Sequence, residues 1–225
     1  MSTELSFEIE IDKLRKRFSK YTRLAFELLP RIENPHILDI GCGSGIPTIM
    51  LAKLSNGKIT GIDIDDCLLD RLEKRIQEEG LSNQVVTKKC SLFDIDFPNE
   101  TFDIVWAEGS IWIIGFKKGL EEWRRLLKPE GFLVVHDSVK TVTNEVNMPP
   151  KLGYELINHF QLPEDAWLKA YCVPLERLIK EQLKKVTDAK TLKILERCQN
   201  EVIMIRSNPK DNISAFYIMQ KTKED

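Results

Sequence analysis

The chain has 225 residues, a formal net charge of −2 and a hydrophobic content of 42%. This length suits a single domain of moderate size. Charges of both signs are mixed along the chain, so the sequence shows no basic patch of the kind that binds nucleic acid. No stretch approaches the ~20 apolar residues of a membrane span. The five cysteines form no Cys-x-x-Cys pair and only three histidines occur, so we expect no metal site. The odd number of cysteines and the lack of an apolar leader predict a cytoplasmic location.

Residues 8–30 predict one or two helices ahead of the first strand. Apolar side chains recur at spacings of three and four residues: Leu14, Phe18, Tyr21, Leu24, Ala25 and Leu28. Pro30 and Pro35 mark the exit from this segment. We therefore expect residues 1–34 to form a helical cap.

A glycine-rich loop follows the first predicted strand. Residues 37–45 read Ile-Leu-Asp-Ile-Gly-Cys-Gly-Ser-Gly, and an amphipathic helix begins directly afterwards. This combination predicts a nucleotide-type cofactor site, because glycine permits a tight turn and close approach of a ligand. The spacing Gly-x-Gly-x-Gly differs from the Gly-x-Gly-x-x-Gly of dinucleotide-binding proteins, and the sequence contains no P-loop pattern.

An acidic residue, Asp63, ends the second predicted strand, which covers residues 58–63. A carboxylate at this position can accept hydrogen bonds from both hydroxyls of a ribose. The alternative role for Asp63 is to cap the next helix, for which Asp65 and Asp66 are better candidates. We expect Asp63 to bind a ribose.

The glycine loop and the flanking Asp39 resemble the first motif of class I S-adenosylmethionine (SAM)-dependent methyltransferases. The resemblance extends over residues 35–140 and includes Lys128-Pro-Glu-Gly131, which matches a Lys/Arg-Pro-x-Gly turn of that family. It implies SAM as cofactor, S-adenosylhomocysteine as product and a small-molecule methyl acceptor. The cofactor-binding residues that we carry over are Asp39, Gly41, Cys42, Gly43, Gly45, Asp63, Ile64, Ser91, Leu92, Phe93, Ala107 and Glu108.

Ser91 departs from the family pattern. In the family an acidic residue after the third strand often contacts the exocyclic amine of adenine. Ser91 would make a weaker hydrogen bond there, while Leu92 offers its backbone N–H and its side chain to the ring. Core packing is the alternative for Leu92 and Phe93.

The fourth predicted strand, in residues 103–110, ends beside the methionine half of the cofactor if the resemblance holds. Glu108 lies there, where a cationic cofactor favours an anion. Glu108 could also hold a substrate amine or act as a base. The alternative is that it is a solvated loop carboxylate without a role in the site. His136 and Asp137 end the fifth strand and are further candidate bases. As strand neighbours they face opposite ways, so at most one enters the site; a hydrogen-bonded histidine without chemistry is the alternative for His136.

Predicted strands and helices alternate between residues 36 and 138, which is typical of a parallel sheet with right-handed crossovers. The last helix of this region has an apolar stripe that ends at Pro129–Gly131: Phe116, Leu120, Trp123, Leu126 and Leu127. The C-terminal part predicts a strand, two helices and a strand, at 153–160, 174–186, 189–206 and 213–219. In the family the last strand is inserted antiparallel.

The expected fold class is α/β, with a doubly wound, mostly parallel seven-stranded sheet, helices on both faces and an antiparallel last strand. We expect one domain over residues 1–225, divided into the cap, a SAM-binding core at 35–140 and a substrate-side half at 141–225. A helical insertion before the last strand covers 163–208. Aromatic side chains outside the core are candidate substrate contacts, with core packing as the alternative: Tyr21, Trp112, Trp167 and Tyr171.

The resemblance implies transfer of a methyl group to an O, N or C atom of a small molecule. The sulfonium is already a strong donor, so the protein mainly has to align donor and acceptor. One alternative is a nucleic-acid or protein methyltransferase, although Ala-Glu-Gly stands where an Asn-Pro-Pro-Tyr-type amine site would follow the fourth strand. The other is a non-catalytic SAM-binding protein, because a fold alone does not imply activity.

Overall fold

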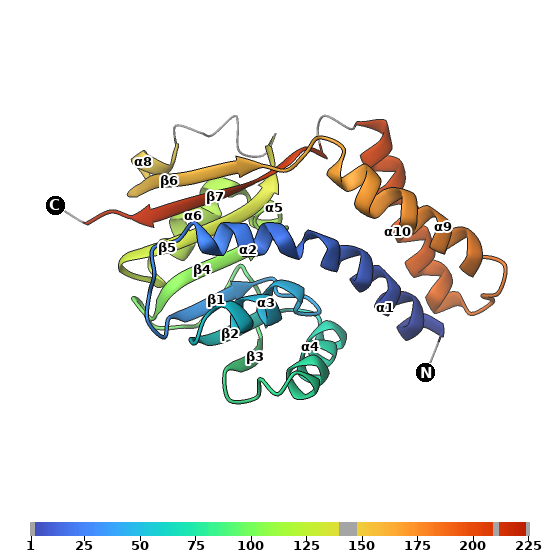
Figure 1. Ribbon diagram of the computed structural model, residues 1–225, viewed down its shortest axis with the longest axis horizontal. Coiled ribbons are helices and arrows are strands. Elements are labelled where there is room, and N and C mark those ends of the chain that lie inside the picture. The colour runs from blue at the N-terminus through green and yellow to red at the C-terminus, as the bar shows by residue number, and fades with distance from the viewer. Residues whose placement is uncertain (1–2, 140–147, 209–211, 224–225) are drawn as a thin grey trace.

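The computed structural model describes residues 3–139, 148–208 and 212–223, and its core is one seven-stranded sheet (Figure 1). The strands are β1 (His36–Ile40), β2 (Lys58–Asp63), β3 (Val85–Lys89), β4 (Phe102–Glu108), β5 (Leu127–Ser138), β6 (Tyr154–Gln161) and β7 (Ser214–Lys221). The helices are α1 (Thr3–Arg15), α2 (Ser19–Glu27), α3 (Ile46–Leu54), α4 (Asp66–Glu78), α5 (Ile111–Ile114), α6 (Phe116–Arg124), α8 (Met148–Lys151), α9 (Val173–Gln182) and α10 (Ala189–Ser207). The short turns η1 (Lys16–Phe18) and η2 (Leu168–Cys172) precede α2 and α9.

The strand order is β3-β2-β1-β4-β5-β7-β6. Strands β1 to β5 pair in parallel, and β7 pairs antiparallel with both β5 and β6. The α/β fold class and the antiparallel last strand are therefore confirmed. Chain order reverses between the adjacent strands β1 and β4, and the carboxyl ends of parallel strands at such a point form the ligand crevice of this fold class.

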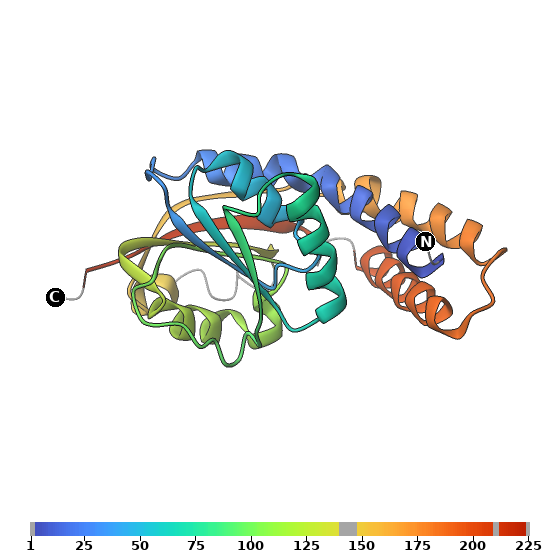
Figure 2. The ribbon, with the colours of Figure 1, turned by 90° about the horizontal axis from the view of Figure 1, so that it is seen from below.

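Side chains alternate between two hydrophobic clusters, one on each face of the sheet. On β4, Trp106 belongs to the cluster covered by α3 and α4, whereas its neighbour Val105 belongs to the cluster beneath α5 and α6. Figure 2 shows the two layers of helices on opposite sides of the sheet. This arrangement explains why the buried strands are apolar along their whole length.

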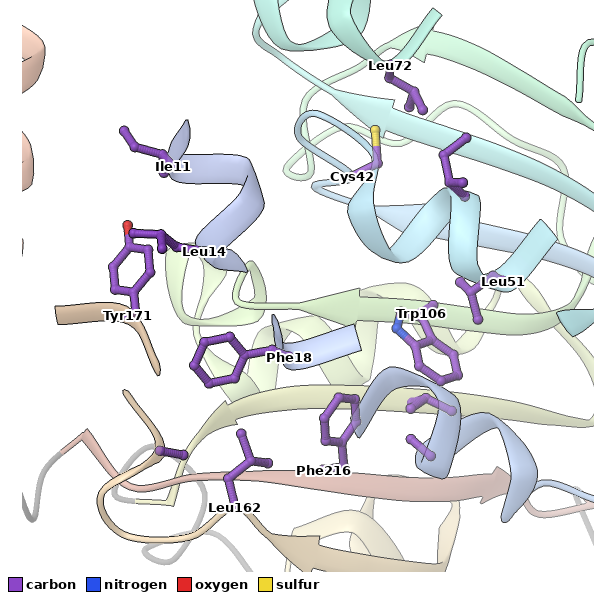
Figure 3. Close-up of a cluster of buried hydrophobic side chains, with 14 of the residues drawn as sticks. Ile11, Leu14, Phe18, Cys42, Leu51, Leu72, Trp106, Leu162, Tyr171 and Phe216 are labelled. Atoms are coloured by element: carbon purple, nitrogen blue, oxygen red, sulfur yellow. The ribbon is translucent and has the colours of Figure 1, made fainter. Parts of the chain in front are cut away.

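A helical lobe, formed by α1, η2, α9 and α10, lies beyond the carboxyl ends of the strands (Figure 1). The hydrophobic core continues from the sheet into this lobe. Figure 3 shows the row of side chains that connects them, from Trp106 and Phe216 on the strands through Phe18 to Tyr171. The N-terminal helices are therefore packed as part of the domain core.

The structure corrects the expected end of one helix. Helix α6 stops at Arg124, and β5 already begins at Leu127, so the apolar residue at 127 belongs to the strand. The reason is long-range pairing: Leu127 lies opposite Phe102 of β4, and the register shifts before Ile104 pairs with Phe132. Helix α9 also ends at Gln182, before the expected residue 186. The expected boundary at 140/141 lies outside the described residues.

Candidate functional site

The glycine loop turns sharply at the end of β1. Gly41, Gly43 and Gly45 have φ angles of 72°, 53° and 83°, in the left-handed region that favours glycine. The backbone N–H groups of Gly41 and Cys42 both donate to the carbonyl of Ile62 on β2, at 2.8 and 3.0 Å. The loop is therefore held in place by the neighbouring strand.

The three glycines of the loop have different surroundings. A Cβ at Gly41 would lie 2.6 Å from Ser110 Cβ, and one at Gly45 would lie 2.1 Å from Leu72 Cδ1. At Gly43 a Cβ would meet nothing within 4 Å. Gly41 and Gly45 thus permit close packing of the protein on itself, and Gly43 is the glycine whose open side a ligand can approach.

Asp63 faces this open loop. Its Oδ2 accepts a hydrogen bond from Gly43 N at 2.9 Å, and its Oδ1 accepts one from Asp65 N at 3.0 Å. A carboxylate has about four lone-pair sites, so about two remain available, which matches the two hydroxyls of a ribose. The competing role as helix cap belongs to Asp65, which accepts from the backbone N–H of Cys67 at 2.9 Å and is the N-cap of α4. The expectation for Asp65 is confirmed.

Two further carboxyl groups lie at the ends of β1 and β4. Asp39 is fully buried, accepts a hydrogen bond of 2.6 Å from Thr48 Oγ1, and has its pKa raised by burial to about 7. Glu108 is half-buried and accepts hydrogen bonds from Trp106 Nε1 at 2.8 Å and from Thr22 Oγ1 at 3.3 Å. Burial raises the pKa of Glu108 to about 7 as well, and the nearby Asp39 adds to the shift.

Among the described residues, none of these three carboxyl groups forms an ion pair with a lysine or arginine. Asp39, Asp63 and Glu108 thus lie around an open glycine loop, and no basic side chain compensates these carboxyl groups when they are ionised. A dinucleotide would place its diphosphate in this field and be repelled, whereas a cationic nucleoside would be attracted. The charge, the free acceptor sites of Asp63 and the open side of Gly43 together suit a ribose attached to a cation.

Four further residues expected to bind the cofactor follow β2 and β3. The side chain of Ile64 is 65% exposed and that of Phe93 is 57% exposed, so neither belongs to the core. Leu92 is half-buried and packs against the cluster beneath α5 and α6. Ser91 Oγ accepts a hydrogen bond of 3.2 Å from Phe93 N and so shapes its own turn. Exposed apolar side chains at these positions provide surfaces on which a flat base can stack.

The side chains of two other expected cofactor residues are buried. The Cys42 side chain is buried in the core, and burial raises the pKa of its thiol. Ala107 is completely buried beneath α5 and α6.

The two candidate bases of β5 face opposite sides of the sheet, as expected. His136 pairs with Glu108 across β4 and β5, so both lie on the side of the sheet that α2 covers. Its ring stacks on Phe216 with centroids 4.4 Å apart, and burial lowers its pKa to about 4. Asp137 points the other way, where it accepts a hydrogen bond from Trp112 N at 3.3 Å.

The four aromatic candidates for substrate contacts are spread over different environments. Tyr21 is half-buried in the cap, and Tyr171 is buried and donates to Glu201 at 3.1 Å. Trp112 is 63% exposed. Trp167 is half-buried and stacks on Phe18 at 4.4 Å. Of the four, only Trp167 also lies beside His136, at a ring distance of 6.3 Å.

A cavity of about 210 Å³ is lined by Glu164, Asp165, Trp167, Leu168, Ile205 and Asn212. Its lining does not include the glycine loop or any of the three carboxyl groups described above. It includes Trp167, whose ring lies beside that of His136.

Residues 37–131 match the family model of a methyltransferase domain. Over this segment the chain is similar to methyltransferase domains. Solved structures of similar fold include complexes with SAM and with S-adenosylhomocysteine.

The chain is similar to several known proteins. A sterol 4-C-methyltransferase of Caenorhabditis elegans is 32% identical over 141 residues, which cover 60% of this chain and 40% of that relative. A methyltransferase from Geobacter sulfurreducens, solved with S-adenosylhomocysteine, has a TM-score of 0.70 at 18% identity and covers 90% of both chains. The [4+2]-cyclase SpnF has a TM-score of 0.77 at 19% identity, over 91% of this chain and 81% of its own. The chain spans less than half the length of the curated relatives that it matches.

Sequence reasoning missed several side chains that contact the candidate site residues. Thr48 and Thr22 hold the two buried carboxyl groups, and Ser214 contacts His136. None lies in a recognisable pattern, because each meets its partner only through the tertiary fold. Nothing in the sequence around Thr22 points to a role in the site. Apolar spacing predicts the helix that carries it, but the residue belongs to no motif.

No helix among residues 3–139, 148–208 and 212–223 is long and apolar enough to span a bilayer.

Proposed function

We propose that this protein transfers the methyl group of SAM to an oxygen, nitrogen or carbon atom of a small molecule. The observation that carries the proposal is the set of three carboxyl groups around an open glycine loop without a basic partner. A sulfonium nucleoside fits this field better than an anionic cofactor does.

The cofactor assignment follows the geometry of the loop. Asp63 binds the ribose hydroxyls, and the open side of Gly43 allows the nucleoside to approach the backbone. The exposed Ile64 and Phe93 lie where the adenine would stack, with Leu92 behind them. Asp39 acts from beneath the loop, since its side chain is completely buried. The other expected cofactor residues contribute their backbone or the geometry of a turn: Gly41, Cys42, Gly45, Ser91 and Ala107.

Glu108 and His136 form the acceptor side of the proposed site. They lie opposite each other on β4 and β5, on the face covered by the cap. A general base works best when its pKa lies near the working pH, and Glu108 has a pKa of about 7 in the free protein. His136, with a pKa of about 4, is neutral and serves better as a hydrogen-bonding group than as a base.

The chemical step in this proposal is a direct displacement. The acceptor atom attacks the methyl carbon, the carbon–sulfur bond breaks and S-adenosylhomocysteine leaves. Alignment of acceptor, methyl group and sulfur supplies most of the rate, because it makes the reaction effectively unimolecular. An acceptor that must lose a proton gives it to Glu108.

The surroundings of the acceptor side favour an apolar small molecule. The rings of Trp167 and Phe216 lie beside that of His136, and Phe18 stacks on Trp167. The sterol methyltransferase among the relatives acts on a lipid-like molecule by its name, which agrees with this environment. We also propose residues 1–34 as the cap, 35–140 as the cofactor core and 141–225 as the substrate-side half. The five cysteines, all free, support a cytoplasmic location.

Calorimetric titration with SAM, S-adenosylhomocysteine and NAD tests the cofactor. We expect micromolar binding of SAM and its product and no binding of NAD. Binding of NAD instead would contradict the electrostatic argument. Transfer of a labelled methyl group from SAM is then measured against a panel of sterol-like, phenolic and amine acceptors.

The turnover experiment separates the alternatives. Labelled product from a small molecule supports the proposal, and labelling of RNA or protein substrates alone would favour the nucleic-acid or protein methyltransferase. SAM binding with no labelled product from any acceptor would favour a SAM-binding protein without transferase activity.

A further inference from the structure

Three side chains from distant parts of the chain form a hydrogen-bonded row beside the acceptor side. Trp167, just before η2, donates through Nε1 to Ser214 Oγ at 2.9 Å. The same oxygen lies 2.9 Å from Nε2 of His136 on β5. Ser214 is the first residue of β7 and is 5% exposed, and His136 is 7% exposed, so the contact between them is buried from solvent.

The number of available protons decides the direction of each hydrogen bond. An indole N–H can only donate, so Ser214 Oγ must accept from Trp167. The serine hydroxyl then has one proton of its own, and His136 Nε2 is its remaining partner among the described residues. If Nε2 carried the imidazole proton, the buried hydroxyl proton would have no acceptor, at a cost of ~1–3 kcal/mol.

A neutral imidazole has one donor nitrogen and one acceptor nitrogen. Burial lowers the pKa of His136 to about 4, so the ring is neutral at physiological pH. With Nε2 accepting from Ser214, the proton must reside on Nδ1, which has no hydrogen-bond partner among the described residues.

We propose that Ser214 and Trp167 are positioning residues that hold His136 in the Nδ1–H form, so that it presents a hydrogen-bond donor to an oxygen atom of the methyl acceptor. The proposal rests on the proposed function, in that His136 lies on the acceptor side. It narrows the acceptor to small molecules with a carbonyl, ether or hydroxyl oxygen near the methylated atom. Such an oxygen accepts from Nδ1–H, while any proton lost by the acceptor goes to Glu108.

The row also ties the histidine to the helical lobe. Trp167 stacks on Phe18 of the N-terminal segment at 4.4 Å, and its ring lies nearly parallel to that of His136, at 9°. The indole can donate to Ser214 only when η2 and the N-terminal segment are packed against the sheet. Hence the proton arrangement of His136 depends on the docking of the lobe.

Nitrogen-15 NMR of histidine-labelled protein tests the proposal directly, without SAM or acceptor. The protein has three histidines, and the His136→Gln variant assigns the signal of His136. We expect the wild-type ring to be neutral at pH 7 with Nδ1 protonated, and the Ser214→Ala variant to shift the proton toward Nε2. Ser55→Ala is the matched control: Ser55 is also a buried serine, but its hydroxyl donates to Leu51 O at 2.9 Å, far from the ring. It should leave the His136 signal unchanged.

Two further variants show whether an effect of Ser214→Ala comes from the lost hydrogen bond or from loss of folding. Trp167→Phe keeps the stacked ring and removes the N–H, so it should give a mixture of the two tautomers. Ser214→Thr keeps the hydroxyl and should restore the wild-type tautomer. A wild-type ring protonated on Nε2, or an unchanged tautomer in Ser214→Ala, would overturn the proposal.

The same variants give a kinetic test once an acceptor is known. We expect Ser214→Ala to lower kcat/KM for the acceptor about tenfold, to leave the affinity for SAM unchanged, and to be rescued by Ser214→Thr. A failure of methyl transfer in the wild-type protein and in all variants would refute the proposed function. The NMR measurement would still test the tautomer of His136 independently.

Discussion

Ser44 of the glycine loop donates a hydrogen bond of 3.0 Å to Oδ1 of Asp12 on the N-terminal helix α1. The other oxygen of Asp12 accepts from Arg71 and from Arg75, both on α4. Asp12 is 4% exposed, so this cluster is buried between the cap and the cofactor core. It connects the conformation of the loop to the docking of the cap.

We predict that Asp12→Asn destabilises the protein and weakens SAM binding. The substitution keeps the shape of the side chain but leaves Arg75 without its carboxylate and Arg71 with Glu8 as its remaining acidic partner. We expect a loss of about 2 kcal/mol in the free energy of unfolding, less than the ~3–5 kcal/mol of a fully buried pair, because Arg75 is 27% exposed. Urea unfolding measures this loss. Glu10→Gln, in an exposed pair with Lys13, is the control and should change little; equal stability of both variants would contradict the prediction.

Asp63→Ala should weaken SAM binding at least tenfold. The reason is the loss of charge-assisted hydrogen bonds to the ribose, which contribute ~1.5–3 kcal/mol. Asp66→Ala removes a neighbouring carboxylate that is solvent-exposed and paired with Lys89, so it should keep wild-type affinity. Calorimetry on both variants decides the point, and unchanged affinity in Asp63→Ala would remove this residue from the site.

Gly43→Val should abolish SAM binding while the protein stays folded. Gly80 provides a matched control, because it too has a positive φ, 68°, and open space where a Cβ would lie. Both substitutions strain the backbone by ~1–3 kcal/mol, but only Gly43 faces the proposed cofactor. Gly80→Val should therefore bind SAM normally at a similar loss of stability. Normal binding by Gly43→Val would count against the assignment of the loop.

The affinity for SAM should rise with pH between 6 and 8. Asp39 and Glu108 have pKa values of about 7 in the free protein, so both are largely protonated at pH 6. A cationic ligand favours the ionised forms, and binding must release these protons. For one such group the affinity should be about tenfold higher at pH 8 than at pH 6. Calorimetry in buffers of different ionisation enthalpy counts the released protons, and Glu108→Gln should release fewer; an affinity independent of pH would speak against both carboxyl groups.

Asp39→Asn should stabilise the protein at pH 8 but not at pH 4. An aspartate ordinarily has a pKa of 3.8, and burial raises that of Asp39 to about 7, so folding favours the protonated form. The stability that this group contributes is fully present below its unfolded pKa and is lost as the pH rises through 7. Asparagine stays neutral and still accepts from Thr48, so we expect a gain on the order of 2–4 kcal/mol at pH 8. Urea unfolding at the two pH values measures it, and an equal effect at both would contradict the stated cause.

Local patterns in the sequence were sufficient to predict the strand, glycine loop and helix that carry the proposed cofactor site. The strand, glycine loop and helix at residues 37–54 are specified by neighbouring residues, as is the cap of α4 by Asp65. The end of α6 was predicted wrongly, because Leu126 and Leu127 continue the helical spacing although pairing with Phe102 places residue 127 in a strand. The spacing of apolar residues indicates which side chains are buried. It does not distinguish the buried end of a helix from the buried start of a strand, because both are short apolar runs.

The sequence by itself determined the class of fold and the glycine loop, because backbone conformation and the spacing of apolar residues act over a few neighbours. The predicted role of Asp63 also came from its place at the end of a strand. Only the tertiary structure decided that Glu108 and His136 lie opposite each other, that Ser214 meets Trp167, and that Asp12 reaches the loop. These contacts join residues far apart in the chain, and their hydrogen bonds and charges become strong only after folding has excluded water around them.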